Sequence, residues 1–209
     1  MTMTASRLNI DAEVRAITAA LAARRDPAYE VGMRRTVPSL QPAHATRVPD
    51  IRATAAEWRK THPDAGSDDL LRLADALWAT GWREERIVAI TLLRHAKPPL
   101  TSEAWPRFVA WSADIDNWEQ VDHLADLTGR MLIAEPRMLP AVQALADSES
   151  GWQRRLSIVA IIVAFQKGGE VWRGPLASMA ERLSGDKHPL VKRAIVWAKD
   201  RLGRDKTHG

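Results

Sequence analysis

Residues 81–90 read GWREERIVAI and residues 151–161 read GWQRRLSIVAI, so one short pattern occurs twice in this chain of 209 residues. Each copy opens with Gly-Trp, continues through arginine and ends in an apolar run. Around the two copies, helix start and stop signals divide the chain into pairs of short helices. The pairs begin near Ser67, Thr101, Pro136 and Gly174, in steps of 34, 35 and 38 residues. A period of this length predicts stacked helix pairs with an extended concave surface.

The rest of the chain supports an all-α fold. Apolar residues recur with helical spacing, and no run of alternating β-branched residues bounded by turn signals appears. We expect one domain over residues 1–209, because no linker interrupts the array, and a long irregular segment from Asp26 to Val48. The predicted helices lie near residues 10–25, 50–61, 68–79, 82–96, 102–112, 118–133, 136–146, 151–166, 175–184 and 189–203.

The amino-acid composition excludes several classes of chemistry. The chain has no cysteine, which excludes disulfides, thiolate metal sites and cysteine nucleophiles. Its six histidines include no pair at i and i+4, so we expect no metal site and no cofactor. The net charge of +4 favours an anionic partner.

The sequence also bears on localisation. The longest apolar run, Ile158–Phe165, is too short for a membrane span, and the first 25 residues lack a secretory signal. We therefore expect a cytoplasmic protein.

Tryptophan is over-represented, with nine of the twelve aromatic residues. Three predicted helices open with tryptophan, at Trp82, Trp118 and Trp152. We interpret Trp82 and Trp152 as residues that pack each helix start on its neighbour. Trp118 differs because Asp122 follows one turn later, on a face away from the apolar stripe of its helix. A tryptophan beside a carboxylate is a candidate site, although an acid in an early helical turn is also favoured by the helix dipole.

Two basic clusters are candidates for phosphate binding. Arg154 and Arg155 lie in the first turns of a helix, where the positive end of the helix dipole disfavours cations. Phosphate at that helix start would compensate for them, and ion pairs with the acids just upstream are the alternative. The last helix is the most basic part of the chain and carries Lys192, Arg193 and Trp197. A solvated basic helix is the alternative there, and periodicity leaves Trp197 open between core and surface.

These segments resemble the AlkD-type DNA alkylation-repair glycosylases. The resemblance rests on Asp116–Asp122 (DNWEQVD), Trp152–Arg155 (WQRR) and Lys192–Trp197 (KRAIVW), with support from Leu77-Trp78, Glu84–Arg86 and Val48–Arg52. It implies a right-handed-type solenoid, or superhelix, of HEAT-like antiparallel helix pairs with a concave DNA-binding face. The pieces occur in the family's order over most of the chain.

Carried over residue by residue, the resemblance implies a set of site residues. The catalytic carboxylate falls on Asp122, the sugar-contacting tryptophans on Trp118 and Trp197, and the phosphate-binding arginine on Arg155, with Arg154 as the alternative. Lys192 and Arg193 would add phosphate contacts. The family's N-terminal tyrosine would be Tyr29, the only tyrosine here, although its spacing to Val48 is longer than in the family pattern. Some members of the family lack the carboxylate, whereas this chain has it.

The resemblance implies a monofunctional glycosylase that hydrolyses the N-glycosidic bond of cationic alkylated purines, such as N3-methyladenine and N7-methylguanine, in double-stranded DNA. We expect it to act as a monomer in the bacterial cytoplasm or nucleoid. Because such bases already carry positive charge, one carboxylate suffices to stabilise the developing oxocarbenium ion and to position water. The alternative is a non-catalytic helical-repeat module that binds DNA or protein, with Asp122 as a surface acid.

Overall fold

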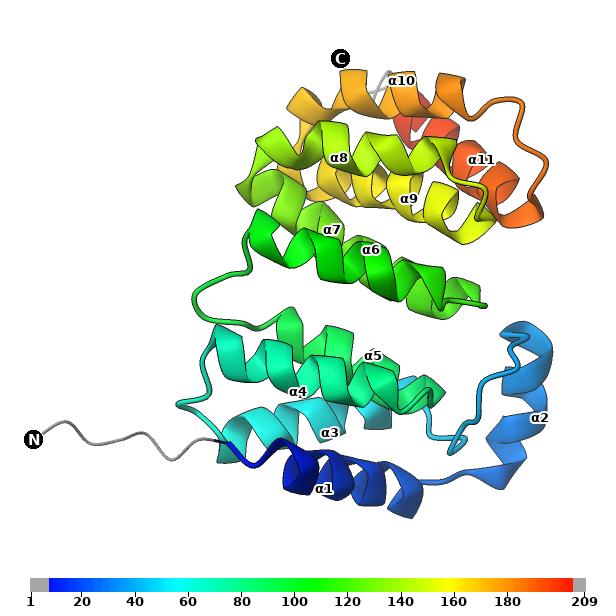
Figure 1. Cartoon of the computed structure of the whole chain (residues 1–209). Helices are drawn as coiled ribbons and strands as arrows, with labels where there is room; N and C mark the ends of the chain where they lie inside the picture. The colour runs from blue at the N-terminus through cyan, green and yellow to red at the C-terminus, as the bar shows by residue number, and fades with distance from the viewer. Residues whose placement is uncertain (1–7, 205–209) are drawn as a thin grey trace, which may run out of the picture. The chain divides into compact units, whose positions relative to one another are not determined.

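The computed structural model describes residues 8–204, and these contain eleven α-helices, four short 3-10 helices and no strand (Figure 1). The predicted all-α class is therefore confirmed. The chain divides into two compact units, Met1–Leu100 and Thr101–Gly209. The solenoid and the single domain stay predictions. None of the helices within residues 8–204 combines the length and the apolar content needed to cross a membrane.

Unit 1 consists of five helices in which α5 is the buried member. The helices are α1 (Ile10–Ala23), α2 (Pro27–Thr36), α3 (Val48–Thr61), α4 (Ser67–Ala79) and α5 (Arg83–Leu93). Helices α1, α3 and α4 all pack against α5, and every residue of α5 is buried. This explains the apolar run Ile87–Ile90, because a helix covered on all sides needs no polar face.

Helix α2 corrects the prediction of an irregular segment between Asp26 and Val48. Residues 27–36 are helical, and only the part from Val37 to Arg47 lacks regular structure. Proline breaks the interior of a helix but is favoured in its first turn, which is where Pro27 lies. The side chain of Asp26 accepts a hydrogen bond from the Tyr29 backbone N–H at 3.1 Å, which caps this helix.

A buried ionic network attaches the segment after α2 to α5. The Arg83 guanidinium donates to Glu84 Oε1 at 2.9 Å, and both side chains are almost inaccessible to solvent. The Glu84 carboxylate also accepts the backbone N–H groups of His44 and Thr46, and His44 Nε2 lies 2.8 Å from Glu85 Oε1. The acidic and basic residues at the start of α5 therefore form a structural network.

Unit 2 is organised around α9 (Gly151–Gly168), which packs against every other α-helix of the unit. Helices α7 (Trp118–Ala134) and α11 (Pro189–Arg204) lie along it, and α6 (Trp105–Ala113), α8 (Leu139–Ala144) and α10 (Arg173–Arg182) also contact it. The 3-10 helices Ser102–Ala104, Pro136–Met138, Leu145–Asp147 and Glu170–Trp172 join these elements. Residues 155–165 of α9 are all buried, so the second copy of the repeated pattern forms the core of the unit.

Helices α7 and α9 pack tightly at Gly129. A Cβ atom on this glycine would lie 2.6 Å from the backbone oxygen of Ala160 and 2.7 Å from the side chain of Val163. A backbone carbonyl inside a packed helix cannot move aside easily. The glycine thus sets how closely the two helices pack, and α7 carries Trp118 and Asp122.

We predict that Gly129→Ala lowers the free energy of unfolding by about 1–3 kcal/mol, because the added methyl group overpacks the α7–α9 interface. Urea unfolding followed by circular dichroism measures the change. Gly174→Ala on α10 is the matched control, since a Cβ there meets no atom within 4 Å. Equal stability of the two variants would contradict the proposed close packing.

Candidate active site

The first turn of α7 presents Trp118 and Asp122 on one side of the helix. Asn117 caps the helix, with its side-chain oxygen accepting the Gln120 backbone N–H at 3.0 Å. Trp118 is 37% exposed although tryptophan usually lies in the core. The Asp122 side chain, one turn later, is 27% exposed. The structure therefore places both residues of the predicted pair where a ligand can reach them.

Arg155 holds the Asp122 carboxylate. Its Nε donates to Asp122 Oδ1 at 2.8 Å and its Nη2 donates to Oδ2 at 2.7 Å, a bidentate geometry. Its Nη1 donates to the Leu190 backbone carbonyl at 2.6 Å. One guanidinium thus links α7, α9 and the first turn of α11. Arg155 is buried, so these contacts satisfy a charge that would otherwise be costly to bury.

Two opposing effects act on the carboxyl group of Asp122. Burial raises its pKa above the ordinary value of 3.8, because a low-dielectric environment disfavours the charged form. The hydrogen bonds and the positive charge of Arg155 act in the other direction, as does the nearby His123, but burial is the larger effect. Arg155 therefore limits the rise of the pKa and keeps the carboxylate oriented. Each carboxylate oxygen still has a lone pair available for water or a substrate.

Arg154 points to a different carboxylate. Its Nε and Nη2 donate to Asp186 at 2.6 and 3.1 Å, and its Nη1 donates to the backbone oxygens of Ser148 and Glu149. Both arginines at the start of α9 are therefore compensated by distant carboxylates of the same unit. Three of the five N–H donors of Arg155 are used, which leaves two for a phosphate. Phosphate binding by either arginine stays a prediction.

The other two helix-start tryptophans pack against histidines of neighbouring loops. Trp82 stacks on His44 with ring centroids 4.2 Å apart, and Trp152 meets the edge of His188 at 5.3 Å. This supports their interpretation as packing residues. Trp118 is the most exposed of the three.

Helix α11 supplies the remaining predicted residues of unit 2. Lys192 and Arg193 are exposed, and neither forms an ion pair within the described residues 8–204. Trp197 is half-buried and lies seven residues after Leu190, which corresponds to a rise of about 10 Å along the helix. The contact of Arg155 with Leu190 fixes the start of α11 beside Asp122, whereas Trp197 lies two turns further on.

Tyr29 belongs to unit 1, on α2, so it cannot be placed relative to Asp122. Its hydroxyl lies 3.4 Å from Arg83 Nη2, and the guanidinium of Arg47 lies over its ring at 4.9 Å. The residue is half-buried and held by cations. Its role in substrate contact stays a prediction.

Two hydrogen-bond partners of the arginines in this site could not be predicted from the sequence. The Leu190 carbonyl is a backbone acceptor and leaves no side-chain signature. Asp186 is 32 residues from Arg154, and no spacing rule connects them. Within residues 8–204, no group of three or more His, Cys, Asp or Glu side chains is placed to hold a metal ion.

The geometry describes an all-α protein with a partly exposed carboxylate, held by a buried arginine, beside an exposed tryptophan and a basic helix. Comparison with known families identifies the class. The family model described as DNA alkylation repair enzyme matches residues 17–207, nearly the whole chain, and the protein belongs to that family. A search of curated proteins found no match. DNA is therefore the partner that the family implies, and the resemblance noted from the sequence is confirmed.

We predict that Arg155→Ala lowers the free energy of unfolding by roughly 1–3 kcal/mol. Loss of one partner from a fully buried ion pair costs about 3–5 kcal/mol, and the partial exposure of Asp122 reduces this amount. The pKa of Asp122 should also rise further, so that ionisation removes more stability as the pH increases from 3.8 through the folded-state pKa.

Urea unfolding at several pH values measures both effects. Arg182→Ala is the control, because its ion pair with Asp147 is largely exposed and should contribute less than about 1 kcal/mol. If both variants unfold at the same urea concentration as the unaltered protein, Arg155 does not have the linking role described above.

Proposed function

We propose that this protein is a monofunctional DNA glycosylase that removes cationic alkylated purines from duplex DNA. The observation that carries the proposal is the Asp122 carboxylate, which is held by Arg155 and only partly covered, one turn from the exposed Trp118. Membership in the family of DNA alkylation repair enzymes supports repair as the process. The choice of glycosidic bond cleavage rests on the resemblance of these residues to the AlkD-type glycosylases, and a carboxylate beside a tryptophan suits that chemistry.

The proposed chemistry suits a single carboxylate. In N3-methyladenine or N7-methylguanine the base carries a positive charge, so the bonding pair of the C1′–N bond leaves with the base and neutralises it. The deoxyribose becomes an oxocarbenium ion, which the negative charge of Asp122 stabilises. Water then attacks C1′ while Asp122 orients it, and the proton of the water is released. No strong general acid is required for this step, because the leaving base is already cationic.

Arg155 acts in this proposal as a positioning residue for the carboxylate. A partly buried carboxylate without a cation would take up a proton more readily and lose the charge that the reaction needs. The bidentate pairing also fixes the orientation of the carboxylate plane. Trp118, with its face exposed, would support the sugar and favour its developing positive charge. Trp197, Lys192 and Arg193 would contribute from α11, the tryptophan at the sugar and the two cations at phosphates.

We predict that Asp122→Asn reduces the rate of N7-methylguanine release by roughly a hundredfold or more, because it removes a central electrostatic contribution to the transition state. Binding to the same duplex should change by less than about threefold, since the charge is needed only as the oxocarbenium ion develops. Single-turnover assays of free base measure the rate, and fluorescence anisotropy measures the binding.

Asp126→Asn is the matched control for this variant. Asp126 lies one turn further along α7 and pairs with Arg130 and Lys167, so the substitution also removes a carboxylate from cations. It should release base at the normal rate. Equal rates for the two variants, or normal excision by Asp122→Asn, would favour the non-catalytic DNA- or protein-binding module instead.

We further predict an acid limb in the pH profile of excision that lies above pH 3.8. The reaction needs the ionised carboxylate, and burial raises the pKa of Asp122, so activity falls as the pH drops through that raised value. Arg155→Lys should shift the limb to higher pH, because lysine cannot form the bidentate pair that lowers the pKa. Rates corrected for release without protein give the profile, and a limb that does not move in Arg155→Lys would contradict the pairing role.

A further inference from the structure

The loop that joins α10 to α11, residues 183–188, is held against the first turn of α9. Arg154 Nε and Nη2 donate to the two carboxylate oxygens of Asp186 at 2.6 and 3.1 Å. Asp186 Oδ1 also accepts the backbone N–H of His188 at 2.7 Å. The Asp186 side chain is only 4% exposed. We call Arg154, Asp186 and His188 the loop clamp, and the proposed excision chemistry does not use it.

The ring of His188 packs directly on the backbone at the start of α9. A Cβ atom on Gly151 would lie 2.4 Å from His188 Cδ2, so the ring occupies the space that a side chain at residue 151 would fill. The edge of the same ring meets Trp152, with centroids 5.3 Å apart. The loop is therefore fixed to α9 by an ion pair and by close packing within the same turn.

The loop clamp ends beside the carbonyl group that binds Arg155. The His188 carbonyl accepts the backbone N–H groups of Val191 and Lys192 at 3.1 and 3.0 Å, so His188 determines where α11 begins. The Leu190 carbonyl, in the first turn of α11, accepts from Arg155 Nη1 at 2.6 Å. Two consecutive residues of α9 thus hold the two ends of one short segment, residues 186–190.

The loop clamp adds little net charge to its surroundings. Burial alone would raise the pKa of Asp186, but hydrogen bonds from Arg154 and from the His188 backbone, with the positive charge of Arg154, bring it below 3.8. Asp186 is therefore ionised at neutral pH, and its charge opposes that of Arg154 at close range. The fields of the two groups largely cancel at a distance.

Few charged groups act on the carboxyl group of Asp122. They are Arg155 from α9 and His123 from its own helix. Helix α11 meets Arg155 through the backbone carbonyl of Leu190, and its Lys192 and Arg193 are exposed to solvent. Any influence of the loop clamp on Asp122 therefore passes through the geometry of Arg155.

We propose that Arg154 and Asp186 are positioning residues for the candidate catalytic carboxylate, because they hold the Leu190 carbonyl on Arg155, which in turn holds Asp122. The importance for catalysis rests on the proposed function, whereas the positioning itself can be measured without any reaction. Arg154, a candidate phosphate ligand from the sequence, thereby acquires a role within the protein.

Loss of the loop clamp has a defined consequence for Asp122. If the Leu190 carbonyl is no longer held in place, the buried Nη1 of Arg155 loses its acceptor, and the guanidinium turns toward another one. The bidentate contact with Asp122 then weakens. Burial, which is the larger effect on Asp122, remains, so the pKa of its carboxyl group rises.

The variant Asp186→Asn distinguishes positioning from a simple field effect. Asparagine still accepts the His188 N–H but lacks the charge that holds Arg154. The pKa of Asp122 is read from its carboxyl ¹³C resonance during a pH titration of the full chain, and the resonance is identified by its absence in Asp122→Asn. We expect a rise of roughly 0.5–1 pH unit, part of the 1–3 that an adjacent opposite charge contributes. Removal of a negative charge alone would lower this pKa, so a fall or no change would overturn the proposal.

A second variant, Arg154→Lys, keeps the charge and changes only the geometry. Lysine cannot form the bidentate pair with Asp186 and also reach the backbone oxygens of Ser148 and Glu149. The pKa of Asp122 should again rise, whereas a field effect predicts no change. This variant decides the proposal if Asp186→Asn fails to fold. The double variant should shift the pKa no more than Asp186→Asn does, because both substitutions break one contact, and additive shifts would overturn the proposal.

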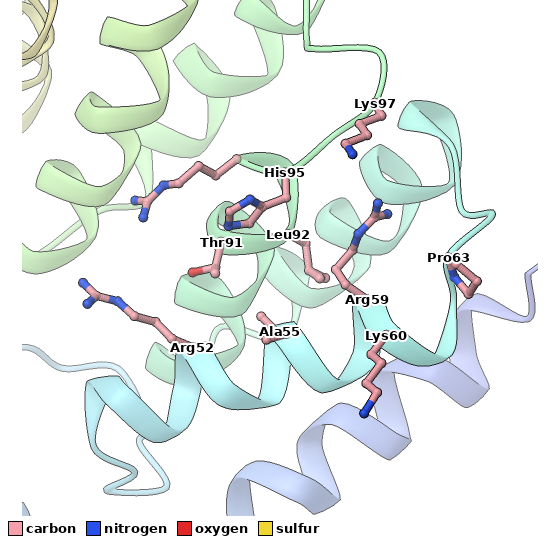
Figure 2. Close-up of a pocket in the computed structure, with 11 residues that line it drawn as sticks. Arg52, Ala55, Arg59, Lys60, Pro63, Thr91, Leu92, His95 and Lys97 are labelled. Carbon is pink, nitrogen blue, oxygen red and sulfur yellow. The ribbon is translucent and has the colours of Figure 1, made fainter. Parts of the chain in front are cut away.

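Two control variants match these substitutions. Asp147→Asn removes a carboxylate that pairs with Arg182, at the end of α10 just before the loop. Arg52→Lys replaces an arginine of unit 1, where Arg52 lines the pocket between α3 and the end of α5 (Figure 2). Neither control should change the pKa of Asp122. Shifts in the controls equal to those in the loop clamp variants would overturn the proposal.

Excision assays separate this proposal from the proposed function. If the protein is a glycosylase that uses Asp122, the acid limb of single-turnover N7-methylguanine release should move to higher pH in Asp186→Asn, by the amount that the titration gives. Absence of base release by the unaltered protein would reject the glycosylase, and the titration would still decide the positioning role. An acid limb that stays in place while the pKa of Asp122 rises would contradict the catalytic role of Asp122 and leave the loop clamp supported.

Discussion

The bidentate ion pair between Arg155 and Asp122 is the interaction on which the organisation of the site depends. Through it and the Leu190 carbonyl, one buried guanidinium connects the helix that carries Trp118 to the helix that carries Trp197. Either charge would be expensive alone in this environment. The pair therefore makes folding of unit 2 and ionisation of the candidate catalytic group depend on the same contacts.

The packing of α9 explains how Arg155 is held in the orientation that allows two hydrogen bonds to Asp122. Helix α9 is covered on all sides, and a helix without an exposed face has little freedom to rotate or slide. The missing side chain of Gly129 brings α7 close to it. A charged group at the end of such a helix is held by its neighbours, as required for a site that orients one carboxylate. Unit 1 uses a comparable device, in which Arg83 and Glu84 at the buried start of α5 hold the segment before α3.

Local features of the chain could be predicted from the sequence, and long-range pairing could not. The start of α7, its Asn117 cap and the placement of Trp118 and Asp122 on one side follow from residues within two turns of each other. The sequence pattern did not predict helix α2, because a proline such as Pro27 is found both where a helix ends and in the first turn of a helix. Arg154 and Arg155 pair with Asp186 and Asp122, which lie 32 and 33 residues away in the sequence, and no local pattern could predict these two partners.

The protein contains two kinds of cationic side chain. An arginine that forms two hydrogen bonds with a carboxylate is a structural or positioning group, and its charge is largely cancelled at a distance. An exposed cation without a partner keeps its field and attracts polyanions, with a strength that depends on salt. Arg154 and Arg155 belong to the first kind, whereas Lys192 and Arg193 on α11 and Arg52 and Lys60 on α3 belong to the second. Both units therefore carry exposed cations without ion pairs among the described residues, although only unit 2 carries the candidate catalytic carboxylate.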